Sequence, residues 1–114
     1  MKENIKFEYD DFTDNMYVSL ARFKHKTTGT IAELAPEVNA MIDYDKKRVI
    51  GILVTNYNEV AASYFDGKNA QTSTTMFNVR LLQVAVAIDK YYEDEGLKAP
   101  IEKINRSMIK LLAA

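Results

Sequence analysis

Apolar and polar residues alternate strictly near the start of the chain. In Ile5-Lys6-Phe7-Glu8-Tyr9 the odd positions are apolar and the even positions are charged, which is the period of a half-buried β-strand. A second alternating segment covers residues 16–24. Residues 10–15 between them are rich in Asp, Thr and Asn, which favour turns because their side chains bond the nearby backbone. The pattern predicts a β-hairpin over residues 5–24.

Three more segments have strand character. Residues 30–34 are predicted as a short strand, and residues 38–44 alternate in polarity. Pro36 lies between them and marks a break or an edge, because proline cannot donate to a central ladder. Residues 49–55 are apolar on both faces, as in a central strand covered on both sides. Gly51 within this run predicts a bulge or a close approach by another part of the chain.

The spacing becomes helical after an ambiguous stretch. Residues 57–73 indicate no single structure, since residues 60–65 fit either a short strand or one helical turn. From Thr74 the apolar spacing predicts a helix to about Glu95, ended by Gly96 in the left-handed conformation. The start of this helix can be capped by Ser73, Thr74 or Thr75.

The long helix is apolar around most of its girth, so we expect it to be largely buried, against the sheet or against another subunit. The residues concerned are Phe77, Val79, Leu81, Leu82, Val84, Val86, Ile88, Tyr91 and Tyr92. Pro100 starts a second helix at the position where a missing N–H costs least. That helix has one apolar stripe and is predicted to bury one side, through Leu97, Ile101, Ile104, Met108 and Leu111.

A run of strands followed by a run of helices is typical of an α+β domain with an antiparallel sheet. We therefore predict four to five strands, in hairpins or a meander, followed by two C-terminal helices packed on the sheet. The chain of 114 residues is predicted to be a single domain over 1–114, with the sheet in 5–56 and the helical pair in 74–113.

The amino-acid composition excludes several classes of function. The chain has no cysteine, which excludes disulfides, thiolate metal sites and a cysteine nucleophile. It carries 15 basic and 16 acidic residues, without the cationic excess that drives non-specific phosphate binding. Its start has no apolar signal region, and no uncharged run approaches the roughly 20 residues of a membrane span. We expect a soluble, cytoplasmic protein that does not bind membranes.

The first half of the chain resembles domain-of-unknown-function family 2283, a small bacterial family. The motifs that carry the resemblance are Tyr9-Asp10, Asp14, Met16-Tyr17-Val18-Ser19-Leu20, the acidic Glu33, Ile42-Asp43-Tyr44-Asp45 and Val49-Ile50-Gly51-Ile52. They span residues 5–56. The resemblance implies a compact antiparallel sheet and is compatible with assembly as a dimer. It implies no activity.

The chain also departs from that family's pattern. Lys46-Lys47-Arg48 replaces a turn that usually contains glycine, and Leu53 stands where the family tends to carry an acid. The two predicted helices extend beyond the family core.

Carboxylates near the first turn are one candidate for chemistry. The set consists of Glu8, Asp10, Asp11 and Asp14. Calcium and magnesium prefer oxygen ligands of this kind, but the segment lacks the ligand spacing and turn glycine of a calcium loop. The alternative is that the Asp side chains cap the hairpin by bonding their own backbone. We expect no metal site here.

Basic residues around the only histidine are a second candidate. Arg22, Lys24, His25 and Lys26 surround Phe23, and basic residues with an interleaved aromatic can hold a nucleic-acid strand. The alternative is an edge strand protected from aggregation by lysine. The last helix is also basic on its polar side, through Lys98, Lys103, Arg106 and Lys110.

Acidic residues crowd the end of the long helix. Glu93, Asp94 and Glu95 lie at the helix C-terminus, where negative charge opposes the helix dipole. Their placement suggests a site for a basic partner surface. The alternative is pairing with Lys90 or Lys98, or simple solvation.

The chain contains no nucleophile elbow, phosphate-binding glycine loop, dinucleotide fingerprint or HExxH motif. We therefore expect a non-enzymatic protein-interaction module, forming a homodimer and binding no cofactor. The second hypothesis is a nucleic-acid-associated or mobile-element regulatory protein, such as an inhibitor of a host nuclease. The third is a small enzyme that uses a divalent metal.

Overall fold

The strands form one antiparallel sheet, as the alternating pattern predicts. The computed structural model describes residues 5–20, 29–43, 48–96 and 100–113. The sheet order is β1-β2-β5-β4-β3, with both hairpin pairs and the central pairs antiparallel. The strands are β1 (Ile5–Asp10), β2 (Asn15–Leu20), β3 (Gly29–Ala35), β4 (Val38–Asp43) and β5 (Val49–Val54). The predicted α+β class is confirmed.

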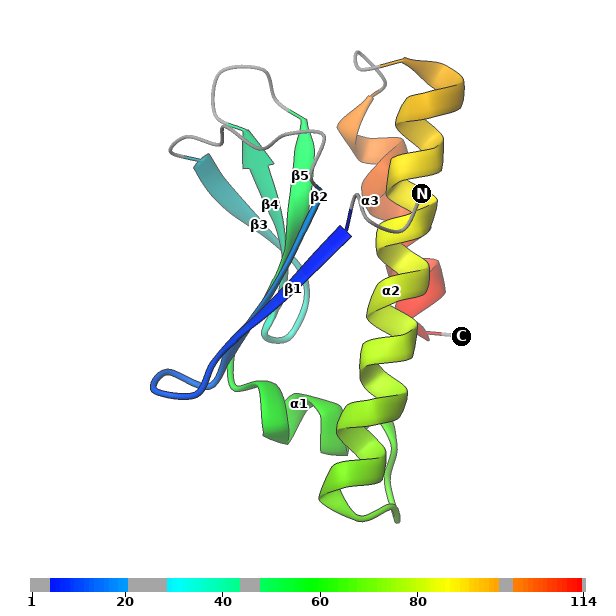
Figure 1. Ribbon diagram of the computed structural model, residues 1–114. Helices are drawn as coiled ribbons and strands as arrows, with labels where there is room; N and C mark the ends of the chain where they lie inside the picture. Colours follow the sequence, from blue (N-terminus) through cyan, green and yellow to red (C-terminus); the bar gives the residue numbers. More distant parts are fainter. Residues whose placement is uncertain (1–4, 21–28, 44–47, 97–99, 114) are drawn as a thin grey trace.

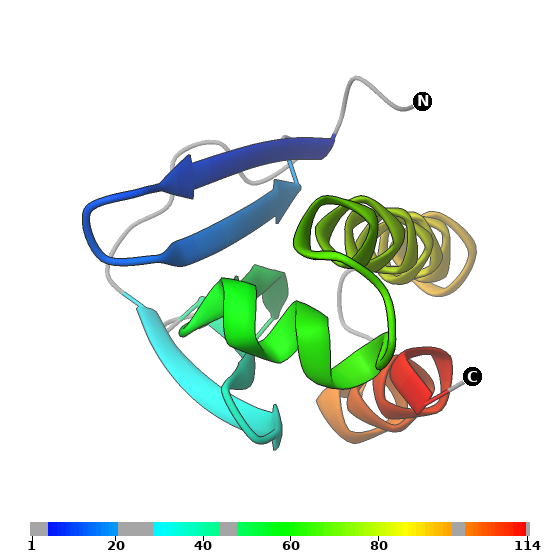
Figure 2. The same ribbon diagram turned by 90° about the horizontal axis from the view of Figure 1, so that it is seen from below.

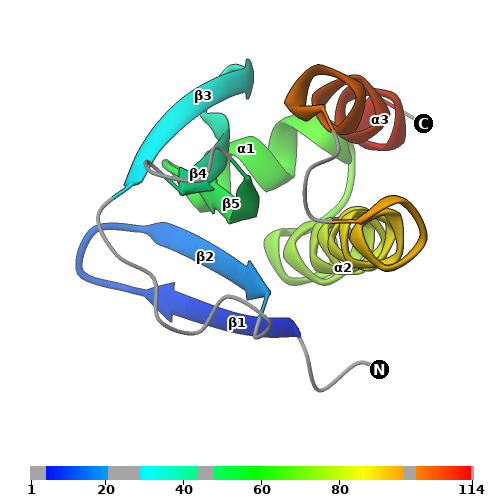
Figure 3. The same cartoon turned by 90° about the horizontal axis from the view of Figure 1, so that it is seen from above.

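Helices follow the strands and cover one face of the sheet (Figure 1). They are α1 (Tyr57–Tyr64), α2 (Ala70–Glu95) and α3 (Ile101–Ala113). Helices α2 and α3 lie side by side over the sheet, and α1 crosses one end of the two layers. Seen along the layers, the β1–β2 hairpin and α2 occupy one side of the molecule, whereas β3 and α3 occupy the other (Figures 2 and 3).

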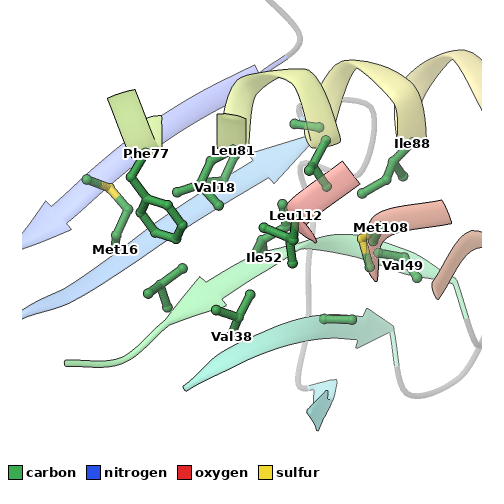
Figure 4. Packing of buried hydrophobic residues seen from close by; sticks show 14 of the residues in the cluster. Met16, Val18, Val38, Val49, Ile52, Phe77, Leu81, Ile88, Met108 and Leu112 are labelled. Atoms are coloured by element: carbon green, nitrogen blue, oxygen red, sulfur yellow. The ribbon is translucent and has the colours of Figure 1, made fainter. Parts of the chain in front are cut away.

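The core lies between the sheet and the helices. In Figure 4, Phe77 and Leu81 of α2 point toward the strands, and Met108 of α3 belongs to the same core. The inward positions of the strands alternate as expected, since Met16, Val18 and Leu20 are buried. Fully or nearly fully buried residues on the helices include Phe77, Leu81, Val84, Ala85, Ile88, Tyr92, Ile104, Met108 and Leu112.

The central position predicted for the apolar segment is confirmed, because β5 lies in the middle of the sheet. Its register against β4 shifts between Met41 and Ile42, at the expected bulge. A Cβ atom on Gly51 would lie only 2.4 Å from the carbonyl oxygen of Val18 on β2. Gly51 therefore allows a close backbone approach that no other residue permits without movement of a strand.

The structure corrects the helix boundaries. In the segment that indicated no single structure, residues 57–64 form α1 and residues 70–73 belong to α2, which begins at Ala70 rather than at the predicted Thr74. The cap is Asn69, whose side-chain oxygen accepts a hydrogen bond from Thr72 N at 2.8 Å. Gly96 ends α2 as predicted, but with φ 90° and ψ 165°, which is outside the left-handed helical region.

Tyr92 links the end of α2 to the start of β5. Val49 N–H donates a hydrogen bond of 2.7 Å to the Tyr92 hydroxyl, and both residues are buried. Burial raises the pKa of the Tyr92 hydroxyl above its ordinary value of 10.0, although the bond from Val49 acts in the opposite direction. Burial also raises the pKa of Tyr57.

These pKa shifts predict a loss of stability in alkali. Below pH 10.0 the buried tyrosines are protonated in both the folded and the unfolded chain. Above it the unfolded chain releases its protons first, so the free energy of unfolding falls as pH rises. Urea unfolding between about pH 8 and pH 11 measures this slope.

The substitution Tyr92→Phe separates the contribution of Tyr92 to the alkaline loss of stability from that of the other tyrosines. The variant should unfold with about 1–3 kcal/mol less free energy at neutral pH, because Val49 N–H loses its acceptor. Its stability should also fall less steeply above about pH 10. Equal alkaline slopes for the wild type and the variant would contradict the assignment.

Candidate protein-interaction face

Strand β1 is an edge of the described sheet. Of the strands that the structure describes, only β2 pairs with it. In an antiparallel pair, alternate residues bond the neighbour and the others turn their N–H and C=O groups outward. β1 therefore presents backbone donors and acceptors to any strand that approaches from the side away from β2.

An apolar groove runs between β1 and α2. Phe7 of β1 and Thr75, Asn78, Val79 and Leu82 of α2 line a hollow of about 370 Å³. Phe7 is half-buried against the core, opposite Val18 in the β1–β2 register. The groove thus combines an open strand edge with apolar side chains beside it. We call β1 together with residues 75–82 of α2 the β1–α2 face.

Exposed apolar side chains mark the helical part of this face. Val79 is 53% exposed and Met76 is 38% exposed. Within one chain this part of α2 buries only its opposite side. The other alternative, burial against another subunit, stays a prediction. Val79 was already visible in the sequence as an apolar residue off the buried stripe. Its place beside an edge strand was not.

Contacts beneath the face hold α2 in place. The Tyr57 hydroxyl donates a hydrogen bond of 2.6 Å to Asn78 Oδ1, and the ring of Tyr57 lies 6.1 Å from that of Phe77. Arg80 donates to the carbonyl oxygen of Leu112 at 3.2 Å, and its guanidinium carbon lies 4.9 Å from the Phe65 ring centre. The exposed residues therefore stand on a helix anchored to α1 and α3.

A cluster of polar side chains lies at the turn of the β1–β2 hairpin, at one end of the β1–α2 face. Asp14 accepts hydrogen bonds from the Tyr9 hydroxyl at 2.7 Å and from the Asn58 side chain at 2.9 Å. The bond to Asp14 raises the pKa of Tyr9. Asp14 has φ 60°, and its carbonyl oxygen accepts from Tyr57 N, so the turn is joined to the start of α1.

These bonds support the structural interpretation of the acidic residues. Asp10 Oδ1 accepts from Phe12 N at 3.0 Å, the local bond expected of a turn aspartate. Among residues 5–20, 29–43, 48–96 and 100–113, no group of three or more acidic or histidine side chains is arranged to hold a metal ion. The metal hypothesis gains no support from this end of the sheet.

The other candidate residues are a basic set and an acidic set. Arg22, Lys24, His25 and Lys26 lie outside the described residues. Glu93, Asp94 and Glu95 are exposed at the far end of α2. One of the alternatives for this acidic set is observed in part, since Asp94 lies 3.2 Å from Lys90.

A second hollow lies between α2 and α3. Ile88, Tyr91, Ile104, Met108 and Leu111 form much of its floor, and its volume is about 300 Å³. A neighbouring hollow of about 540 Å³ is bordered by Tyr91, Glu95, Lys103, Arg106 and Lys110. Lys103, Arg106 and Lys110 of the predicted basic set therefore border the same hollow as the Tyr91 ring, and the acidic Glu95 shares that border. Lys98 lies outside the described residues.

No family model matches the chain, and no curated protein or solved structure was found to be similar to it. The resemblance to family 2283 stays a prediction. Within the part of the chain that the structure describes, no helix is long and apolar enough to cross a membrane.

Proposed function

We propose that the chain is a non-enzymatic protein-interaction module that works in the cytoplasm and binds protein partners through the β1–α2 face. The observation that carries the proposal is the juxtaposition of an open strand edge with an apolar groove and the exposed Val79. Extended segments bind such places by adding a strand, with backbone hydrogen bonds giving affinity and side-chain pockets giving specificity.

Association through this face should depend on its helical side chains. Met76 and Val79 are exposed, so Met76→Glu/Val79→Glu should leave the fold intact while placing charge in the apolar contact. We expect the wild-type chain to form a stoichiometric complex with protein, whether another protein or its own copy. The double variant should lose at least about tenfold in affinity.

The measurement is isolation of the tagged chain from its host at moderate salt, followed by light scattering and identification of bound protein. Gln71→Glu/Gln83→Glu adds the same charge at exposed positions of α2 that do not line the groove, and it serves as the control. Equal binding by the wild type and the Met76/Val79 variant would overturn the assignment of this face. Absence of any protein complex would overturn the proposed function.

Nucleic-acid association is the second candidate, favoured by one observation. Lys103, Arg106 and Lys110 border the same hollow as Tyr91, and charge with stacking is how single strands are held. Oligonucleotide affinity that falls steeply with salt would support this function. No measurable binding at low salt would exclude direct binding.

A further inference from the structure

The charges on β1 are self-complementary. Lys6 and Glu8 flank Phe7, and both point to the sheet face away from the helices, because their partners Ser19 and Tyr17 alternate with the buried residues of β2. Their side chains are 70% and 63% exposed. Within one strand the Lys6 ammonium and the Glu8 carboxylate are 3.9 Å apart, a weak surface contact.

A second copy of the same strand can match this pattern in one register. When two β1 strands lie antiparallel about a twofold axis through Phe7, each Lys6 stands opposite the partner's Glu8. The same register places Ile5 opposite Tyr9 on the helix-side face, and Phe7 opposite Phe7. Opposite charges and aromatic–aliphatic pairs directly across a ladder are both favourable.

Neighbouring registers are less favourable. An axis through Lys6 places two lysines opposite each other, and an axis through Glu8 does the same with two glutamates. Like charges directly opposite destabilise a strand pair. Pairing about Phe7 is the register among these three in which each charge meets its complement.

The other edge of the sheet does not offer this pattern. β3 has the sequence Gly-Thr-Ile-Ala-Glu-Leu-Ala, so it carries one acidic residue and no cation. Self-complementarity therefore belongs to β1, the strand whose free edge lies beside the exposed apolar residues of α2.

We propose that two copies of the chain join through their β1 strands, paired antiparallel about Phe7, to form one continuous sheet across a twofold axis. In this dimer α2 of each copy lies on the same side of the joined sheet, and Val79 faces the partner across the groove. A twofold interface of this kind uses one patch twice, so a single substitution changes two contacts. The inference rests on the proposed function and names its partner as a second copy.

Charge reversal tests both the partner and the register. Lys6→Glu places glutamates opposite each other at both symmetric contacts, and Glu8→Lys places lysines there. Each single variant should raise the dimer dissociation constant by about tenfold or more. The double variant Lys6→Glu/Glu8→Lys should restore the wild-type value, because every pair is again opposite in sign. An equimolar mixture of the two single variants should form a heterodimer.

Light scattering and sedimentation at several concentrations give the mass, with twice the 13.0 kDa of the chain expected for the wild type. Lys68→Glu makes the same charge change at an exposed residue between α1 and α2 and should leave the dimer unchanged. Circular dichroism checks that each variant is folded.

Three results would overturn the inference. A wild-type monomer that still binds another protein through Met76 and Val79 would remove the second copy as partner and leave the proposed function standing. A wild-type dimer insensitive to both reversals would move the interface elsewhere. Single variants that weaken the dimer without rescue in the double variant would exclude pairing about Phe7.

Discussion

Replacing Gly51 with alanine should lower the free energy of unfolding by about 3 kcal/mol or more. The added Cβ would lie 2.4 Å from the backbone oxygen of Val18, far inside van der Waals contact. Backbone atoms in a paired strand cannot turn aside as a flexible side chain can, so β2 and β5 must separate at this point. We expect urea unfolding to show the loss.

A second glycine shows that the effect is steric. Gly67 has φ 82° and nothing within 4 Å of an added Cβ, so Gly67→Ala meets only the conformational cost of about 1–2 kcal/mol. Gly51, by contrast, is not among the glycines with positive φ. A loss for Gly51→Ala no larger than that for Gly67→Ala would contradict the close approach of β2 and β5.

The regular periods of the chain explain why much of the fold could be predicted. Strict alternation around Phe7 and around Val18 leaves one face toward the core, so both strands and the hairpin follow directly over residues 5–20. Residues 21–24 of the predicted hairpin lie outside the described residues. The run from Val49 is buried at Val49, Ile50 and Ile52, which agrees with a central strand. These predictions depend only on which residues are buried, and the order of apolar and polar residues indicates that directly.

The start of the helical half could not be predicted in the same way. Residues 57–64 form a short helix with one polar side. The segment is too short for its apolar spacing to distinguish a helical turn from a strand. The true cap of α2, Asn69, competed with three Ser and Thr residues that follow it closely. Local chemistry allowed several starts. In the structure Ser73 lies inside the helix, and its hydroxyl donates to the carbonyl oxygen of Phe65 at 3.3 Å.

The candidate interface depends on neighbours that are distant in the chain. Phe7 and Val79 line one groove, yet 71 residues separate them, and no spacing rule connects a strand with the outer side of a helix. The alternation of Lys6 and Glu8 was evident from the start, but it indicated only a half-buried strand. Its self-complementarity becomes meaningful once β1 is known to be an edge.

Substitutions on the two sides of α2 distinguish effects on folding from effects on association. A residue that serves the fold should be indispensable in the isolated chain, whereas a residue that serves an interface should matter only when a partner is present. Phe77 and Val79 allow this comparison on one helix. They are two positions apart in sequence, so their side chains lie about 200° apart around the helix axis. Phe77 is fully buried among the strands, and Val79 is 53% exposed beside β1.

Phe77→Ala should therefore lower the free energy of unfolding by about 3–5 kcal/mol, through lost burial and the cavity left behind. Its ring also lies 5.1 Å from that of Tyr64, so the contact between α1 and α2 weakens too. Val79→Ala should change the stability of the dissociated chain by no more than about 0.5 kcal/mol, since alanine is the better helix former and little surface is uncovered.

Concentration distinguishes the two effects. Unfolding of a dimer depends on protein concentration, whereas unfolding of a monomer does not. With wild-type chain, raising the concentration should raise the apparent stability, and Val79→Ala should reduce that rise while leaving the dilute limit unchanged. Phe77→Ala should lower the dilute limit itself. If Val79→Ala were as damaging as Phe77→Ala at low concentration, Val79 would belong to the core and the β1–α2 face would lose its central apolar residue.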